Sequence, residues 1–196
     1  MKSSVTEIFG IAGSGKTTYV NEQNEYEMLS LSRWKKVIIF LWVIFLEMNV
    51  LAKSVKITKG FRYIRGLSFV LYKLKMVSIF KKKYKNNYIY DQGPIFNYVL
   101  LRTILNSKNH HKLEKELDKI FHRIKNNLDE SIYLVCDLDI AIDRIYEREK
   151  NHIYKNMRRS KALKDLEIWQ QEYDRVAGLL SSKRIDANEN NCFKEW

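Results

Sequence analysis

A glycine-rich segment close to the N-terminus limits the folds open to this chain more than any other feature. The segment Gly10–Thr17, GIAGSGKT, fills every fixed position of the pattern GxxxxGK[ST], which forms a phosphate-binding loop. Its glycines allow the backbone to turn so that successive N–H groups surround an anion, and the following helix directs its N-terminal dipole at the same point. The pattern requires a strand before the loop, and the apolar run Val5–Phe9 fits that requirement.

Each part of the loop has an expected role in binding a nucleotide. Lys16 is expected to reach the terminal phosphates, and the hydroxyl of Thr17 is expected to coordinate Mg²⁺. Thr18 is expected to add a phosphate contact. The other residues expected to hold the phosphates are Gly10, Gly13, Ser14 and Gly15. The loop therefore predicts nucleotide binding, with ATP and Mg²⁺ as cofactors.

Composition supports one folded unit and suggests the charge of its partners. The chain has 196 residues, 45% of them hydrophobic, and a single proline, which predicts one helix-rich domain over residues 1–196. Its formal charge of +12 suits nucleotides, phosphorylated substrates, nucleic acid or an acidic membrane surface. Cys136 and Cys192 sit in no metal or redox spacing, and the glycine loop occupies the place of a signal peptide. We therefore expect reduced thiols in a cytoplasmic protein.

The most apolar segment is Val37–Leu46, VIIFLWVIFL. It is shorter than the roughly 20 residues that cross a bilayer. Polar and charged residues bracket it, namely Lys35, Lys36, Glu47 and Asn49. A buried helix from about Ser32 to Lys53 is favoured, and a second parallel strand over Val37–Leu41 is the alternative. Attachment to a membrane surface and a homodimer interface around Trp42 stay open.

The segment Tyr88–Asp91, YIYD, favours a short buried strand that ends in an acid. In a phosphate-loop fold, such a strand beside the first one places its carboxylate next to Mg²⁺ and its waters. Asp91 is therefore a candidate metal ligand, and a turn or helix-cap role is the alternative. Pro94 is expected in the first turn of the next helix.

The remaining segments alternate between helices and strands. Helices are expected from Thr17 to about Leu29, and over Leu67–Phe80, Ile95–Leu105, His111–Leu128 and Ala162–Leu180. Strands are expected over Ser131–Cys136 and Lys183–Asp186. The last helix carries an apolar stripe that we interpret as core and not as a cofactor site: Leu163, Leu166, Trp169, Tyr173, Val176 and Leu180. This order predicts a three-layer α/β domain with a parallel sheet flanked by helices.

Basic residues cluster near the last helix. Arg144 and Arg148 are four residues apart, which would place them on one helical face. The segment Asn151–Lys161, with Arg158, is strongly basic, and such a segment could close over a phosphoryl group as charge develops on it. Another cluster, at Lys81, Lys82, Lys83 and Lys85, is better explained as a solvated helix end than as a nucleic-acid site.

With these motifs in order, the chain resembles the thymidylate kinase and nucleoside kinase branch of the phosphate-loop (P-loop) kinases over most of its length. The loop FGIAGSGKTT is close to that branch's own version, and YIYDQGP sits where these kinases carry a strand ending in Asp-Arg or Glu-Arg. DRIYERE resembles the arginine pair at the start of the family's lid, and RIDAN resembles its final strand and adenine-side loop. The Asp-Gln-Gly form resembles uncharacterised kinase-like proteins of bacterial surface-polysaccharide gene clusters.

The resemblance implies a P-loop NTPase fold and ATP-dependent phosphoryl transfer. It implies nucleotide-clamping and catalytic roles for Arg144 and Arg148, and contacts to the base from Asp186, Ala187 and Asn188. Two departures concern the acceptor. Gln92 replaces the family's arginine, and the second-strand acid that serves nucleoside kinases as a base has no clear counterpart. Candidates for the missing groups are Glu47 as the acid, and Arg62 or Arg65 as the substrate arginine.

These observations favour a kinase that acts on a small-molecule acceptor. Lys16 and the loop would hold the phosphates, Thr17 and Asp91 would serve the metal, and Asp91 could also act as the base. The arginines expected to neutralise transition-state charge are Arg144, Arg148 and Arg158. A nucleotide-binding regulatory protein that has lost transfer is the second hypothesis, and a nucleic-acid-end kinase is the third.

Overall fold

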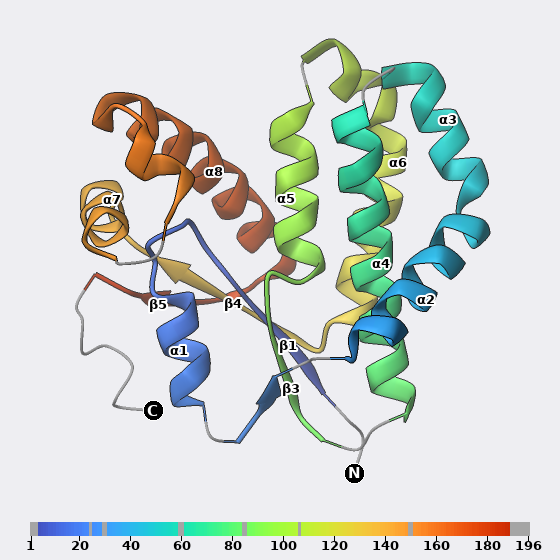
Figure 1. Ribbon diagram of the computed structural model, residues 1–196, viewed down its shortest axis with the longest axis horizontal. Coiled ribbons are helices and arrows are strands. Elements are labelled where there is room, and N and C mark those ends of the chain that lie inside the picture. Colours follow the sequence, from blue (N-terminus) through green and yellow to red (C-terminus); the bar gives the residue numbers. More distant parts are fainter. Residues whose placement is uncertain are drawn as a thin grey trace.

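The computed structural model describes residues 4–23, 25–28, 31–58, 61–83, 86–105, 107–148 and 151–188 (Figure 1). Within these ranges, five strands form one parallel sheet. The strands are β1 (Val5–Phe9), β2 (Glu27–Met28), β3 (Tyr88–Asp91), β4 (Glu130–Val135) and β5 (Lys183–Asp186). The predicted α/β class with a parallel sheet is confirmed, and so are the predicted strands at β1, β3, β4 and β5.

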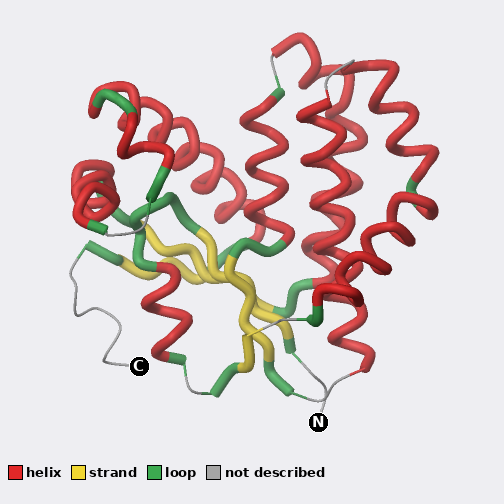
Figure 2. The backbone as a smooth tube through the Cα atoms, viewed as in Figure 1, coloured by secondary structure: helices red, strands yellow, loops and turns green. Residues whose placement is uncertain are grey.

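Helices flank the sheet on both faces. The helices are α1 (Lys16–Glu22), α2 (Arg33–Leu46), α3 (Met48–Thr58), α4 (Phe61–Lys83), α5 (Pro94–Ile104), α6 (Ser107–Asn127), α7 (Leu138–Glu147) and α8 (Arg159–Leu180), with a 3₁₀ turn η1 (Ile153–Asn156). Figure 2 shows α1 on one face of the sheet and α4, α5 and α8 on the other. Because both faces are covered, all five residues of the central strand β1 are buried.

The order of the strands, β2-β3-β1-β4-β5, brings two predicted site segments together. Ile8 of β1 pairs with Asp91 of β3 on one side and with Ile132 of β4 on the other. Parallel strands end at the same edge of a sheet, and ligands of open α/β sheets bind at that edge. The phosphate loop after β1 and the acid that ends β3 are therefore neighbours.

The first helix is shorter than predicted. It ends at Glu22, whereas the sequence pattern suggested an end near Leu29, which lies outside the described residues. The chain then turns into the edge strand β2, in which Glu27 pairs with Tyr88 and Met28 with Ile89. Both residues of β2 are exposed, so no apolar pattern marked this strand in the sequence.

The apolar segment after β2 is helical, as favoured, but it is neither continuous nor buried. It divides at Glu47 into α2 and α3, whose axes differ by 67°. Only Val43 of α2 is buried. Val37–Leu41 belongs to this helix, so the alternative assignment of a second strand there is wrong. Among the described residues, no single helix is both long and apolar enough to cross a membrane.

A close contact between α4 and α5 explains why α4 is longer than predicted. It begins at Phe61 and not near Leu67, and it contains Gly66 in its interior. A Cβ at Gly66 would lie 3.2 Å from Leu101 Cδ1 of α5, so glycine allows the two helices to approach. Helix α5 begins with Pro94 in its first turn, as predicted.

Candidate active site

The phosphate loop follows β1 and leads into α1, as its sequence requires. Gly10, Gly13 and Gly15 have positive φ angles of 152°, 88° and 83°. A Cβ at Gly13 would lie 2.2 Å from the carbonyl oxygen of Ala141, and one at Gly10 would lie 2.6 Å from that of Leu134. The sharp turn and the close packing against β4 and α7 therefore both depend on glycine.

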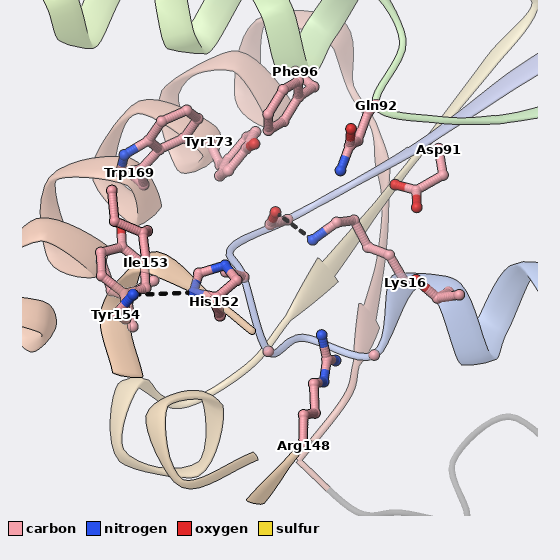
Figure 3. Close-up of a pocket in the computed structure, with 16 residues that line it drawn as sticks. Lys16, Asp91, Gln92, Phe96, Arg148, His152, Ile153, Tyr154, Trp169 and Tyr173 are labelled. Atoms are coloured by element: carbon pink, nitrogen blue, oxygen red, sulfur yellow. Dashed lines mark hydrogen bonds between the residues drawn. The ribbon is translucent and has the colours of Figure 1, made fainter. Parts of the chain in front are cut away.

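Lys16 folds back over the loop (Figure 3). Its Nζ donates hydrogen bonds to the carbonyl oxygens of Gly10, at 2.8 Å, and Ile11, at 2.7 Å. Burial lowers the pKa of Lys16 to about 8, although the charge of Asp91 acts in the opposite direction. The ammonium group thus sits in the hollow of the loop, where a phosphate could replace the two carbonyl groups as its partner.

Asp91 lies beside Lys16 at the end of β3, as Figure 3 shows. Its Oδ1 is buried and has no hydrogen-bond partner among the described residues, and burial raises the pKa of its carboxyl group. The next residue, Gln92, has a φ of 58°, an uncommon conformation for a residue other than glycine, and its amide points into the same space. A strained backbone at Gln92 and an unpartnered buried oxygen of Asp91 therefore occur together at this point, and both features are typical of functional sites.

These groups line one cavity of about 350 Å³ at the carboxyl edge of the sheet. Opposite the phosphate loop, the rings of Phe96 and Trp169 are stacked with centroids 5.7 Å apart. Leu166, Trp169 and Tyr173 of α8 all line the cavity, and Trp169 and Tyr173 lie 5.9 Å apart by ring centroids. The prediction that the α8 stripe is core is confirmed for Leu166 and Tyr173, and Trp169 packs against that core. All three residues also line the cavity, which the sequence pattern did not indicate.

The two predicted lid arginines lie on different sides of the loop. Helix α7 ends at Glu147, so Arg148 is outside the helix and the expectation of one shared helical face is wrong. Arg148 lines the cavity and points at the phosphate loop (Figure 3). Arg144 instead donates to the carbonyl oxygens of Ala187, at 2.6 Å, and Asn188, at 2.8 Å.

These contacts hold the loop after β5 against α7. The side chain of Asn188 also accepts a hydrogen bond from the backbone N–H of Asp137, at 2.7 Å. Asp186 in turn accepts one from the backbone N–H of Asn188, at 2.9 Å. Arg144 and the Asp186–Asn188 segment, which were both expected on the nucleotide side, are therefore in contact with one another.

Several predicted residues lie away from the cavity. Glu47, the candidate acid, accepts a hydrogen bond from Arg123 of α6 at 2.7 Å. Arg65 lies over the ring of Phe69, 5.8 Å from its centroid. Thr17 lines the cavity, but Thr18, Arg62 and Arg158 are exposed and are not among its lining residues. Cys192 lies outside the described part of the chain.

Sequence reasoning missed Glu7, which is completely buried in β1. Its two carboxyl oxygens accept hydrogen bonds from the backbone N–H groups of Ile95, at 2.8 Å, and Phe96, at 3.0 Å, in the first turn of α5. Gly93 makes this approach possible, since a Cβ there would lie 2.6 Å from the carboxyl carbon of Glu7. The only signal in the sequence was a lone acid within an apolar strand.

The cavity fits Mg²⁺ better than it fits a metal with a full protein ligand set. Among the described residues, no group of three His, Cys, Asp or Glu side chains could hold a metal ion. Mg²⁺ does not need one, because it usually keeps several waters and binds one or two protein oxygens together with phosphates. The hydroxyl of Thr17 and the unpartnered oxygen of Asp91 line the cavity and are suitable donors.

Comparison with known proteins supports the fold class. No family model matches the chain, and no curated protein matches it. Among solved structures, the chain is similar to deoxyadenosine kinase from M. mycoides with products dCMP and a flexible dCDP bound, with 17% identity and a TM-score of 0.55 over 94% of this chain and 90% of that one. The same kinase with bound dATP gives 16% identity and a TM-score of 0.51, again over 94% and 90%.

The similarity at this level of identity is one of fold, and the chain has the fold of a P-loop kinase. The comparisons give no support to the narrower resemblance to proteins of surface-polysaccharide gene clusters.

Proposed function

We propose that this chain is a kinase that transfers the terminal phosphoryl group of ATP to a small acceptor, in the manner of nucleoside kinases. One observation carries the proposal: Lys16 of the phosphate loop, the unpartnered buried oxygen of Asp91 and the guanidinium of Arg148 meet in one cavity. Phosphoryl transfer needs positioned positive charge more than covalent help from the protein, and this cavity supplies such charge. The similarity in fold to a deoxyadenosine kinase adds support.

In this proposal, the loop holds the phosphates. Backbone N–H groups of the loop surround them, and Lys16 exchanges the carbonyl oxygens of Gly10 and Ile11 for phosphate oxygens. Arg148 approaches the same phosphates from the opposite side and neutralises charge in the transition state. Arg144, by contrast, organises the Asp186–Asn188 loop on which the nucleotide base would rest.

Thr17 and Asp91 would hold Mg²⁺, Thr17 through its hydroxyl and Asp91 directly or through water. When bound, the metal would neutralise charge between the two terminal phosphates. Asp91 has a second task if it also accepts the proton of the acceptor hydroxyl.

The aromatic wall favours a planar acceptor. Phe96 and Trp169 are stacked, and Tyr173 and Tyr154 complete the wall that faces the phosphate loop. A nucleobase can stack on such a wall, whereas a sugar without a ring system of π electrons gains less from it. We therefore propose a nucleoside-like acceptor, whose polar edge could bond with the amide of Gln92.

A regulatory protein that binds nucleotide without transferring phosphate is the alternative. One observation favours it: in the described part of the chain, Asp91 is the only carboxylic acid that lines the cavity. A single carboxylate would have to serve both the metal and the acceptor hydroxyl.

Transfer of labelled phosphate from ATP in the presence of Mg²⁺ separates the two functions. The acceptor panel should contain nucleosides, nucleoside monophosphates, sugars and lipid-linked sugars, with Lys16→Ala as the blank. A labelled nucleoside product that disappears in the variant would support the proposal. ATP binding without a labelled product from any acceptor would favour the regulatory protein.

Asp91→Asn should lower the rate of transfer by roughly 10² to 10³-fold and leave ATP binding within about threefold, because the lost charge acts mainly on the metal and the transition state. Rates at saturating and limiting acceptor concentrations measure the effect. Asp118→Asn, on the exposed face of α6, is the matched control and should behave as wild type. Full turnover by Asp91→Asn would remove Asp91 from the site.

Trp169→Ala should raise the KM of an aromatic acceptor by about 10-fold to 100-fold, the usual effect of losing one base-stacking side chain. Trp169→Phe should restore most of the affinity, since it keeps a ring against Phe96. An unchanged KM in Trp169→Ala would mean that the acceptor binds elsewhere.

A further inference from the structure

Helix α2 carries an apolar stripe that is largely exposed. Trp34, Ile38, Leu41, Trp42 and Phe45 are spaced by four, three, one and three residues, which places them on one face of the helix. Their exposed fractions are 78%, 64%, 60%, 47% and 71%. Such a continuous row of large exposed apolar side chains is unusual on a folded domain and marks an interaction surface.

The stripe points outward because the opposite face of α2 already packs on α4. The ring of Phe40 contacts the rings of Phe69, at 5.6 Å between centroids, and Tyr72, at 5.8 Å. Val43 is buried at 3% exposure on the same side. Helix α2 therefore lies along the surface of the domain, as Figure 1 shows, and offers only its outer face to a partner.

A groove of about 430 Å³ opens between α2 and α4 next to this stripe. Its walls are apolar and aromatic, formed by Val37, Phe40, Leu41, Phe69, Tyr72, Met76 and Tyr90. Three cations complete the lining, namely Arg33, Lys36 and Lys73. Among the described residues, no carboxylic acid lines the groove.

Two like charges, Lys36 and Lys73, lie at the groove. Lys73 lies over the ring of Tyr90, 4.6 Å from its centroid. Burial and the charge of Lys36 lower the pKa of Lys73, whereas the charges of Glu7 and Asp91 act in the opposite direction. The Lys75 ammonium lies 4.0 Å from the centroid of the Trp42 ring on the stripe itself. An anion placed among these cations would relieve their repulsion.

The cations beside the apolar stripe favour an anionic partner over a second copy of this chain. A symmetric pair of chains would place the same surface on itself. Helix α2 contains three basic residues, Arg33, Lys35 and Lys36, and no acid. The acid that follows it, Glu47, is already bonded to Arg123. A second copy would therefore bring no negative charge to these cations.

The geometry points to the surface of an anionic phospholipid membrane as the partner of α2. The outer stripe would enter the boundary between headgroups and acyl chains, and the lipid phosphates would contact Arg33, Lys35 and Lys36. The groove would accept part of an acyl chain, with the headgroup near Lys73. Trp34 would lie at the headgroup level, where tryptophan is enriched in membrane-bound proteins.

Sedimentation with lipid vesicles tests this inference. Wild-type chain should bind vesicles of phosphatidylglycerol and phosphatidylcholine at least about tenfold more tightly than vesicles of phosphatidylcholine alone. The double variant Ile38→Glu/Phe45→Glu should lower this binding by more than tenfold, since it removes two apolar side chains that would enter the membrane. Lys35→Ala/Lys36→Ala should lower it by about tenfold or more, at roughly 1 kcal/mol for each charge.

Matched controls distinguish the α2 surface from general effects of charge. Leu179→Glu alters an exposed apolar residue of α8, and Lys164→Ala removes an exposed lysine of α8; both should bind vesicles as wild type does. All variants change exposed positions, so ATP binding and thermal unfolding should be unchanged and would report a folding defect. These readouts are independent of whether the chain transfers phosphate.

Two outcomes would overturn the inference. The first is a lack of lipid or site specificity. Wild type would then bind both kinds of vesicle equally, or Leu179→Glu would lose as much binding as Ile38→Glu/Phe45→Glu does. The second is a wild-type chain that binds no vesicles but is dimeric by light scattering, with Phe45→Glu monomeric. The second result would make the stripe an interface between two copies of this chain.

Discussion

Replacement of Lys16 by alanine is expected to reduce phosphoryl transfer about a thousandfold or more. Among the described residues, Lys16 is the only lysine that lines the cavity, and its ammonium sits in the hollow of the loop where terminal phosphates would bind. A fixed positive charge at the transferring group acts where water is excluded, so its loss costs about 4 kcal/mol of transition-state stabilisation. Lys164→Ala, on the exposed part of α8, is the matched control.

The same lysine predicts how nucleotide affinity depends on pH. The pKa of Lys16 is lowered to about 8, so the ammonium group loses its proton as the pH rises through that value. Affinity for ATP should therefore fall between pH 7 and pH 9 in wild type and change much less in Lys16→Ala. Isothermal titration at several pH values measures both. Parallel pH profiles for the two proteins would show that Lys16 does not contact the nucleotide.

The second large effect concerns Glu7 and the stability of the fold. Burial raises the pKa of Glu7 from 4.5 to about 8, against the opposing effect of its two backbone hydrogen bonds and of Lys73. The folded chain thus holds a proton that the unfolded chain releases above pH 4.5. The contribution of Glu7 to the free energy of unfolding is fully present below that pH and is lost progressively as the pH rises to about 8. The loss is on the order of 5 kcal/mol, since each pKa unit corresponds to about 1.4 kcal/mol.

Glu7→Gln isolates this contribution, because glutamine cannot ionise but can still accept a hydrogen bond from the first turn of α5. The difference in free energy of unfolding between variant and wild type should grow in favour of the variant by several kcal/mol between pH 5 and pH 8.5. Urea unfolding at both pH values measures it, and the subtraction removes the other titrating groups. A constant difference would mean that Glu7 is ionised in the folded chain at neutral pH.

The phosphate loop and its flanking elements could be predicted from sequence because the constraints there are local. A turn that needs positive φ angles at Gly10, Gly13 and Gly15, directly after a buried strand, has few alternatives. The strand ending in Asp91 and the helix opened by Pro94 were equally visible, since a short apolar run and a proline at a first turn are local signals. The parallel order of the sheet followed from the alternation of these elements.

The path of α2 and the division at Glu47 could not be predicted in this way. An apolar run is expected in a core, yet α2 lies on the surface with most of its large side chains exposed. What decides its position is the packing of Phe40 against Phe69 and Tyr72 of α4 and the contact of Glu47 with Arg123 of α6. These partners are distant in sequence, and the pattern of α2 alone does not identify them.

The sequence alone determined the class of fold and the position of the loop, because the residues that we propose to bind phosphate adjoin one another in the chain. Only the tertiary structure decided the composition of the rest of the site. It separated Arg144 from Arg148 by ending α7 between them, and it brought Phe96 of α5 against Trp169 of α8. It also buried Glu7 against the first turn of α5. Each of these contacts joins segments that meet only when the helices pack on the sheet, so no local pattern could record them.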